Sequence, residues 1–185
     1  MIKKMLFAGS FMFLLAGCAS LSQEECQQGN WQTIGYNDGA QGYKVERFSS
    51  HQEACAEYKV RPNFQLYKQG YEKGIVTYCR PNKGYDLGKQ LSQYEGVCPS
   101  HLETAFLNAY LDGLEANYRA AQTTLNSKNS EYRRLSALLS SSREENTRRK
   151  IQNDLKTLDN EIEQLESKQE TAIELRDRAE SILSH

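Results

Sequence analysis

A heptad pattern of apolar residues runs through the second half of the chain and restricts it to paired helices. Residues 100–185 contain no proline and a single glycine, Gly113. Two series of positions, spaced alternately by four and three residues, run from 107 to 139 and from 151 to 183. All 20 positions are apolar or Tyr except Lys128, Gln169 and Arg176. Such a narrow apolar seam is typical of a coiled coil.

A serine-rich stretch separates the two series. Ser142 and Glu145 have the spacing of a capping box, in which the two side chains satisfy free amides at a helix start. We therefore expect two arms, about 101–139 and 143–183, folded back as an antiparallel hairpin. The alternative is one continuous helix that pairs with a second chain, because serine alone does not break a helix.

The two alternatives differ in which residues they bring together. In a hairpin, Leu111 should lie near Ala172 or Ala179. In a continuous helix, Leu111 and Ala172 would be about 90 Å apart, at 1.5 Å per residue.

The first half of the chain has a different composition. Residues 19–99 hold nine of the 12 glycines, all three prolines and eight of the 11 tyrosines. We expect a compact helical head over residues 18–99 and a helical tail over residues 100–185, which together give an all-α fold. Residues 1–17, which precede the head, have the charge and hydropathy of a signal peptide.

The leader resembles that of a bacterial lipoprotein. Lys3 and Lys4 precede an apolar run over residues 5–15, which is too short to span a membrane. The run ends in Leu15-Ala16-Gly17-Cys18, which is similar to a lipobox. The resemblance implies cleavage before Cys18, a covalent lipid on its sulfur as the only cofactor-like group, and a stable membrane anchor. Ala19, where a sorting Asp is absent, favours the outer membrane and a periplasmic location.

Four further cysteines remain after Cys18. An even number in an exported chain indicates two disulfides. We expect short helices at about 31–42, 50–59, 63–79 and 85–94, the second starting at a Ser50/Glu53 capping box. Antiparallel packing of consecutive helices favours the pairs Cys26–Cys55 and Cys79–Cys98, although four cysteines allow three connectivities.

Tyr and Gly recur three residues apart in the head. Glycine in a helix costs about 1 kcal/mol relative to alanine, so its repeated use needs a reason. The spacing places small residues on one helix face, where a neighbouring backbone can approach closely. A pocket lined by tyrosines, for a sugar or peptide, is the functional alternative. The pairs are Tyr36/Gly39, Tyr67/Gly70, Tyr71/Gly74, Tyr85/Gly88 and Tyr110/Gly113.

The order of these residues carries a family resemblance. The chain runs from Cys26 through Trp31 and the motif Gly35-Tyr36-Asn37-Asp38-Gly39 to Cys55, then through the later Tyr-Gly motifs to Gly113. This order resembles the DUF2799 family of bacterial lipoproteins over roughly residues 24–118. The resemblance implies an envelope location and a cysteine-rich head, and it supplies no catalytic residue.

Some residues allow a chemical hypothesis of their own. His51, Cys55, Cys79 and Cys98 could form a zinc site, but the close cysteine pair typical of structural zinc is absent. Asp38 could act on a glycan together with Asp86 or Glu95, although no spacing singles out a pair. We therefore expect neither catalytic nor metal-binding residues.

Charge restricts the class of partner. The net charge of −1 is unlike that of a general nucleic-acid-binding protein. The stretch 143–150 is rich in basic residues and could contact phosphate or anionic lipid, or it could be a solvated hairpin tip.

These observations predict a non-enzymatic outer-membrane lipoprotein that binds or spaces envelope partners through its tail. A protein partner on the coiled coil fits the charged helix faces, whereas the oligomeric state stays open. The alternative function is a head that binds or hydrolyses cell-wall glycan or peptide, with the tail as a spacer.

Overall fold

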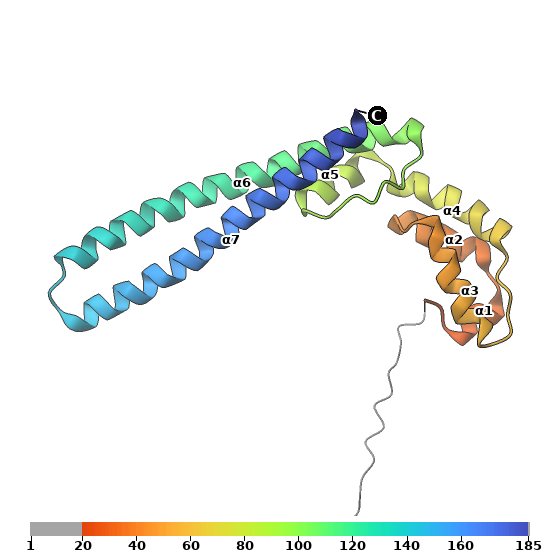
Figure 1. Ribbon diagram of the computed structural model, residues 1–185, viewed down its shortest axis with the longest axis horizontal. Coiled ribbons are helices and arrows are strands. Elements are labelled where there is room, and N and C mark those ends of the chain that lie inside the picture. Colours follow the sequence, from red (N-terminus) through yellow and green to blue (C-terminus); the bar gives the residue numbers. More distant parts are fainter. Residues whose placement is uncertain (1–19, 185) are drawn as a thin grey trace, which may run out of the picture.

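The computed structural model describes residues 20–184, and these residues form an all-α fold, as predicted (Figure 1). The predicted lipidation site, Cys18, lies outside the described residues. The helices are α1 (Gln23–Gln28), α2 (Trp31–Gln41), α3 (Phe48–Ala56), α4 (Phe64–Tyr78), α5 (Pro81–Lys89), α6 (Ser100–Ser141) and α7 (Glu145–Leu183), with a short 3-10 helix, η1 (Val45–Arg47), before α3.

The two long helices form a hairpin, so the prediction of an antiparallel tail is confirmed. Figure 1 shows α6 leaving the head, turning, and α7 returning so that the C-terminal end lies beside the head. Leu111 and Ala172 line the same hollow between the two helices, as the hairpin requires. The continuous-helix alternative is wrong. Among residues 20–184, no helix is long and apolar enough to cross a membrane.

The turn of the hairpin is built differently from the predicted capping box. Helix α7 begins after Glu144, whose carboxylate accepts hydrogen bonds from the backbone N–H groups of Asn146 and Thr147. Ser142 instead donates its hydroxyl to the carbonyl of Leu138, at 2.8 Å. The Ser142/Glu145 box was therefore wrong by two residues, because a carboxylate was available to cap α7.

Two of the polar seam residues find partners across the hairpin. The Lys128 ammonium lies 2.7 Å from the Glu161 carboxylate. Gln169 donates to the side-chain oxygen of Gln122 at 2.9 Å. Polar pairs at seam positions are satisfied in only one register, so they fix how the arms align.

The predicted helices 31–42 and 63–79 agree with α2 and α4 within one or two residues. Helix α3 starts earlier than predicted, because η1 runs directly into it and Ser50 caps nothing. Helix α5 also starts earlier, at Pro81, since proline suits the first helical position. Sequence reasoning missed α1, although Ser22 and Glu25 form a complete capping box there.

Two disulfides join the head, and both pairs agree with the prediction. Cys26 is bonded to Cys55 and Cys79 to Cys98, with Cα–Cα distances of 5.5 and 5.6 Å. All four sulfur atoms are thereby used, so the alternative zinc site with His51 does not form. Among residues 20–184, no group of three His, Cys, Asp or Glu side chains is placed to hold a metal.

One hydrophobic core extends across the change in composition at Pro99. Phe106 and Leu107, near the start of α6, are fully buried against the head. Leu175 and Ala179, near the end of α7, belong to the same core. The base of the hairpin is therefore part of the head, and only the rest projects from it.

Candidate functional site

Helices α2 and α4 pack with their backbones in direct contact at four glycines. A Cβ atom added at Gly35, Gly39, Gly70 or Gly74 would come within 3 Å of backbone atoms of the opposite helix. Real Cβ atoms essentially never approach so closely, so only glycine fits. The close-approach interpretation of the Tyr-Gly spacing is confirmed.

Helices α5 and α6 repeat this arrangement. Gly39 of α2 lies against the carbonyl of Tyr71, and Gly88 of α5 lies against the carbonyl of Tyr110. Each of these tyrosines belongs to the second helix of its pair. The shared motif is Gly/Ala-Tyr-x-x-Gly, which occurs at residues 35–39 and 70–74 in the first pair and at 84–88 and 109–113 in the second.

A tyrosine hydrogen bond confirms that the two pairs correspond. The Tyr71 hydroxyl donates to the carbonyl of Tyr43 at 2.8 Å, and the Tyr110 hydroxyl donates to the carbonyl of Ser92 at 2.9 Å. Each acceptor lies four residues after the last glycine of the motif in the first helix. Each pair is also preceded by one disulfide, which joins the segment before its first helix to the segment before its second helix. The head therefore consists of two copies of one structural unit.

The copies differ in the residues next to the glycines. Asp38 precedes Gly39 in the first copy, whereas Leu87 precedes the equivalent glycine in the second. Tyr67 stands one turn before Tyr71, and Phe106 occupies the same place in the second copy. The Tyr67 hydroxyl donates to Asp38 Oδ2 at 2.8 Å. A buried polar pair in one copy is thus an apolar pair in the other.

Asp38 is the centre of a buried polar cluster, which we call the Asp38 cluster. His51 Nε2 lies 2.7 Å from Asp38 Oδ2, and His51 Nδ1 lies 2.9 Å from the Ser20 hydroxyl. Arg47 Nε lies 3.4 Å from Asp38 Oδ1. The cluster consists of Ser20, Asp38, Arg47, His51 and Tyr67, and it joins the start of the described chain to α2, η1, α3 and α4.

The cluster is closed to solvent at its centre. Asp38 is 6% exposed and His51 is 1% exposed. Burial is the main cause that raises the pKa of Tyr67 well above its usual value, and the hydrogen bond to Asp38 adds to it. The Tyr67 hydroxyl therefore keeps its proton and remains a donor. A buried carboxylate of this kind is tolerated only while its partners remain in place.

The order Ser20, His51, Asp38 resembles a nucleophile, base and acid in series. Catalysis would require a substrate to reach the Ser20 hydroxyl next to a histidine that is 1% exposed. The imidazole also packs edge-on against the Tyr67 ring, with centroids 5.8 Å apart. The arrangement therefore supports a positional role, which holds Ser20 on the head.

The carboxylates named from the sequence do not form a pair with Asp38. Its oxygens face Tyr67, His51 and Arg47 within the cluster. Asp86 is exposed on α5, and Glu95 forms an exposed ion pair with Lys44 at 3.0 Å. The structure therefore gives no support to a glycan-cleaving pair.

The buried tyrosines fill the head, and of these Tyr94 and Tyr110 also line a small hollow against α7. Tyr71 and Tyr110 donate to backbone carbonyls, and Tyr94 donates to Glu103 at 2.7 Å. Burial raises the pKa of Tyr110 to about 12, and burial together with the bond to Glu103 raises that of Tyr94. These buried hydroxyls have partners within the chain, which gives no support to the alternative of a sugar-binding or peptide-binding tyrosine pocket.

The segment containing both helix pairs matches a known family model. The model is described as "Protein of unknown function (DUF2799)", and it matches residues 30–115. Residues 30–115 belong to the DUF2799 family. No curated protein and no solved structure matches the chain.

The DUF2799 segment covers all seven helix-packing glycines and the buried part of the Asp38 cluster. Its end at residue 115 coincides with the place where α6 leaves the core. Ser20 and Cys26 precede the segment, and most of the hairpin follows it.

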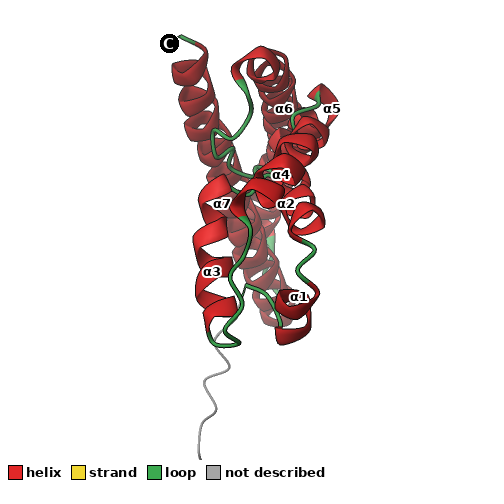
Figure 2. Ribbon diagram, turned by 90° about the vertical axis from the view of Figure 1, so that its right-hand side faces the viewer, coloured by secondary structure: helices red, strands yellow, loops and turns green. Residues whose placement is uncertain are grey.

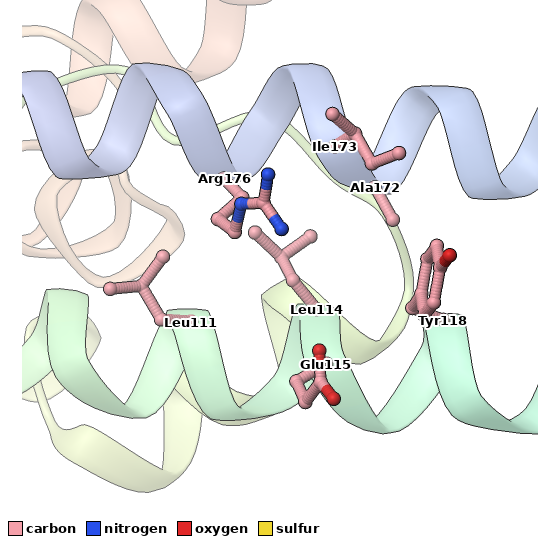
Figure 3. A pocket seen from close by; sticks show the side chains of 7 residues that line it. All are labelled: Leu111, Leu114, Glu115, Tyr118, Ala172, Ile173 and Arg176. Atoms are coloured by element: carbon pink, nitrogen blue, oxygen red, sulfur yellow. The ribbon is translucent and has the colours of Figure 1, made fainter.

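The hairpin closes on itself where it leaves the DUF2799 domain. Figure 3 shows Leu114 and Tyr118 of α6 directed toward Ala172 of α7, with Arg176 beside them. Further along, Leu135, Ile151 and Leu158 form a second apolar cluster. The seam is therefore occupied within one chain.

Sequence reasoning named Asp38 and His51 separately but missed the cluster. Its members are far apart in the chain: His51 lies 13 residues and Tyr67 lies 29 residues from Asp38. The sequence signal that could have revealed the cluster is the repeat. Aligning the four Gly/Ala-Tyr-x-x-Gly motifs places Asp38 at the position that Leu87 occupies in the second copy, which marks Asp38 as unusual.

Proposed function

We propose that this protein is a non-enzymatic, lipid-anchored protein of the outer membrane that faces the periplasm. In this proposal the DUF2799 domain sits at the membrane and the hairpin holds or spaces an envelope partner. The observation that carries the proposal is a closed, disulfide-joined head from which a rigid arm projects. Helix α6 continues 28 residues beyond Gly113, which is about 42 Å.

The start of the described chain supports the anchor. Leu21 is 6% exposed and belongs to the core of the head, and the Ser20 hydroxyl forms a hydrogen bond with His51. Only two residues, Ala19 and Ser20, separate Leu21 from Cys18, which limits the distance between them to about 10 Å. A lipid on Cys18 would therefore hold the domain directly at the bilayer surface.

The chemistry of the head supports a non-enzymatic role over the glycan-hydrolysing or peptide-hydrolysing alternative. The polar groups expected of such a site are engaged with one another, and the central histidine is buried. The outer faces of the arm remain available, and they are strongly charged.

The anchor is tested with the substitution Cys18→Ala in cells fed an alkyne fatty acid. The wild type should incorporate the label and fractionate with the outer membrane, whereas the variant should remain unlabelled. Equal labelling of both proteins would contradict lipidation at Cys18. Labelled wild type in inner-membrane fractions would contradict the proposed location.

The arm is tested by removing two heptads from each helix, residues 122–135 and 156–169. This deletion keeps the seam in phase, removes both polar seam pairs, and shortens the arm by about 21 Å. A photo-crosslinker at the exposed position Asn153 should capture a partner in the full-length protein, while one at buried Leu158 serves as the matched control.

The shortened protein, with its crosslinker at the exposed position Asn146, should lose this partner although it remains folded and anchored. Unchanged capture by the shortened protein would contradict a spacing role. Capture only through head positions would favour the binding head instead.

A further inference from the structure

The end of the hairpin carries a charge opposite to that of the returning arm. We define the hairpin tip as residues 133–150. The tip has six basic and two acidic residues, whereas residues 151–184 have four basic and nine acidic residues. A tip of net charge +4 thus adjoins an arm of net charge −5, in a protein whose total charge is −1.

Most of the positive charge at the tip is free to meet a partner. Two cations already have partners within the tip. The Arg148 guanidinium donates to the carbonyls of Leu139 and Ser142 and closes the turn, and Arg149 Nε lies 3.5 Å from the Glu145 carboxylate. Five basic residues of the tip are exposed: Arg133, Arg134, Arg143, Arg149 and Lys150.

An exposed apolar residue lies among these cations. The Leu138 side chain, in the last turn of α6, is 43% exposed and is not covered by α7. Cationic side chains around an apolar one match the surface of an anionic bilayer, where the cations meet phosphate groups and the apolar group enters the interface.

The shape of the molecule places the tip on the same side as α1, the first described helix. In Figure 1 the hairpin slopes downward from the head, so that its turn and α1 both lie on the lower side of an arch. Figure 2, turned about the vertical axis, again shows α1 at the lower end. Helix α1 follows Leu21 directly, so it marks where a lipid on Cys18 would enter the bilayer.

We propose that the hairpin tip is a second membrane contact, which binds anionic phospholipid headgroups of the leaflet that holds the lipid anchor. This inference rests on the proposed anchor at Cys18. The competing occupant of the tip is the acidic arm of a second copy of this chain, and it is distinguished by the experiment.

The experiment uses the full lipidated protein in vesicles of phosphatidylcholine, with or without 30% phosphatidylglycerol. Leu138→Trp places a fluorophore at the tip, and brominated lipids quench it on contact. Ile173→Trp, at an exposed position on the arm, is the matched control. We expect quenching of the tip fluorophore in anionic vesicles only, and none at the arm.

A charge series identifies the cause. Each cation near an anionic surface favours binding about fivefold, so Arg134→Gln, Arg143→Gln and Lys150→Gln together should weaken the tip contact about 100-fold. Quenching should be lost in that variant. It should be retained when Arg134 and Arg143 are changed to Lys, because the charge is kept.

Flotation of the same samples separates the inference from the proposed function. Protein that floats on both kinds of vesicle without quenching at the tip would overturn the tip contact and leave the anchor intact. A change in the fluorescence of the Leu138→Trp tip that needs no lipid and grows with protein concentration would overturn the membrane contact. It would instead indicate that a second copy of the chain binds the tip. Wild type that floats only on anionic vesicles, and not after the triple Gln change, would retain the tip contact and contradict the anchor.

Discussion

The two glycine-packed helix pairs share one backbone arrangement and fill it with different side chains. In α2 and α4, Asp38 and Tyr67 form a buried polar contact, whereas Leu87 and Phe106 take their places in α5 and α6. The unit therefore folds without a buried carboxylate.

The difference extends to the residue four positions before the second cysteine of each copy. This residue is His51 in the first copy and Tyr94 in the second. Both rings pack on the equivalent aromatic residue, at 5.8 Å from Tyr67 and 4.9 Å from Phe106. His51 forms a hydrogen bond with Ser20 of the N-terminal segment, whereas the Tyr94 hydroxyl donates to Glu103 at the start of α6. The comparison indicates that the polar cluster serves to attach the N-terminal segment.

The largest effect should come from removing the centre of the cluster. Asp38→Ala leaves His51 and Tyr67 without their common acceptor and Arg47 without its ion-pair partner. Breaking a buried pair of this kind costs about 4 kcal/mol. Urea unfolding of the purified protein measures the loss.

The matched control gives the first copy the side chains that the second copy has at the equivalent positions. The triple change Asp38→Leu, His51→Tyr and Tyr67→Phe should stay within about 1 kcal/mol of wild type, since an apolar replacement of a buried charged group is often neutral. It should also release Ser20, which limited proteolysis near the N-terminus detects. A triple variant as unstable as Asp38→Ala would contradict the equivalence of the two copies.

The disulfides should contribute similarly in the two copies. Replacing Cys26 and Cys55 by Ser, or Cys79 and Cys98 by Ser, opens loops of 29 or 19 residues. The chain-entropy relation gives about 3 kcal/mol for each. Thermal unfolding of the two double variants measures both losses, and a difference above about 2 kcal/mol would show that one copy depends more on its crosslink.

A smaller, equal loss is expected at the equivalent glycines Gly74 and Gly113. A Cβ at either would press on a carbonyl, that of Tyr36 or that of Tyr85. Overpacking of this kind costs about 2 kcal/mol, although alanine suits a helix better than glycine does. Gly96, which has nothing within 4 Å but a φ of +69°, provides a control for backbone strain without crowding. A stabilised Gly74→Ala or Gly113→Ala protein would refute direct backbone contact.

The smallest effect concerns alkaline pH. Burial raises the pKa of Tyr110 to about 12, so the unfolded chain loses this proton near pH 10 while the folded chain keeps it. Stability should therefore fall as the pH rises from about 10 to 12. Tyr110→Phe should flatten this fall in pH-dependent unfolding curves. An unchanged slope in the variant would assign the alkaline loss to other tyrosines, including Tyr71 in the first copy.

The parts predicted well from the sequence were those with a local or periodic signal. The seam positions from Leu107 to Leu139 and from Ile151 to Leu183 repeat every seven residues, and this period predicts two long paired helices. The serine-rich break between the series favoured a hairpin but left a continuous helix open. Export and helix order were sufficient to favour the correct cysteine pairs.

The parts that were missed depend on choices between nearby alternatives or on distant contacts. Glu144 and Ser142 both suit a helix cap, and only the geometry of the turn selects Glu144. Neither the contact of Asp38 with Tyr67 nor that of His51 with Ser20 has a local pattern, because tertiary packing brings these residues together.

Helix α6 belongs to two parts of the molecule at once. Its first turns pack on Gly84 and Gly88, and the same unbroken helix continues to Ser141 at the turn. The Cys79–Cys98 disulfide ends two residues before this helix starts. In mechanical terms α6 is a lever with its pivot in the second helix pair. A pull on the turn is transmitted along this helix to the second helix pair, next to the Cys79–Cys98 disulfide.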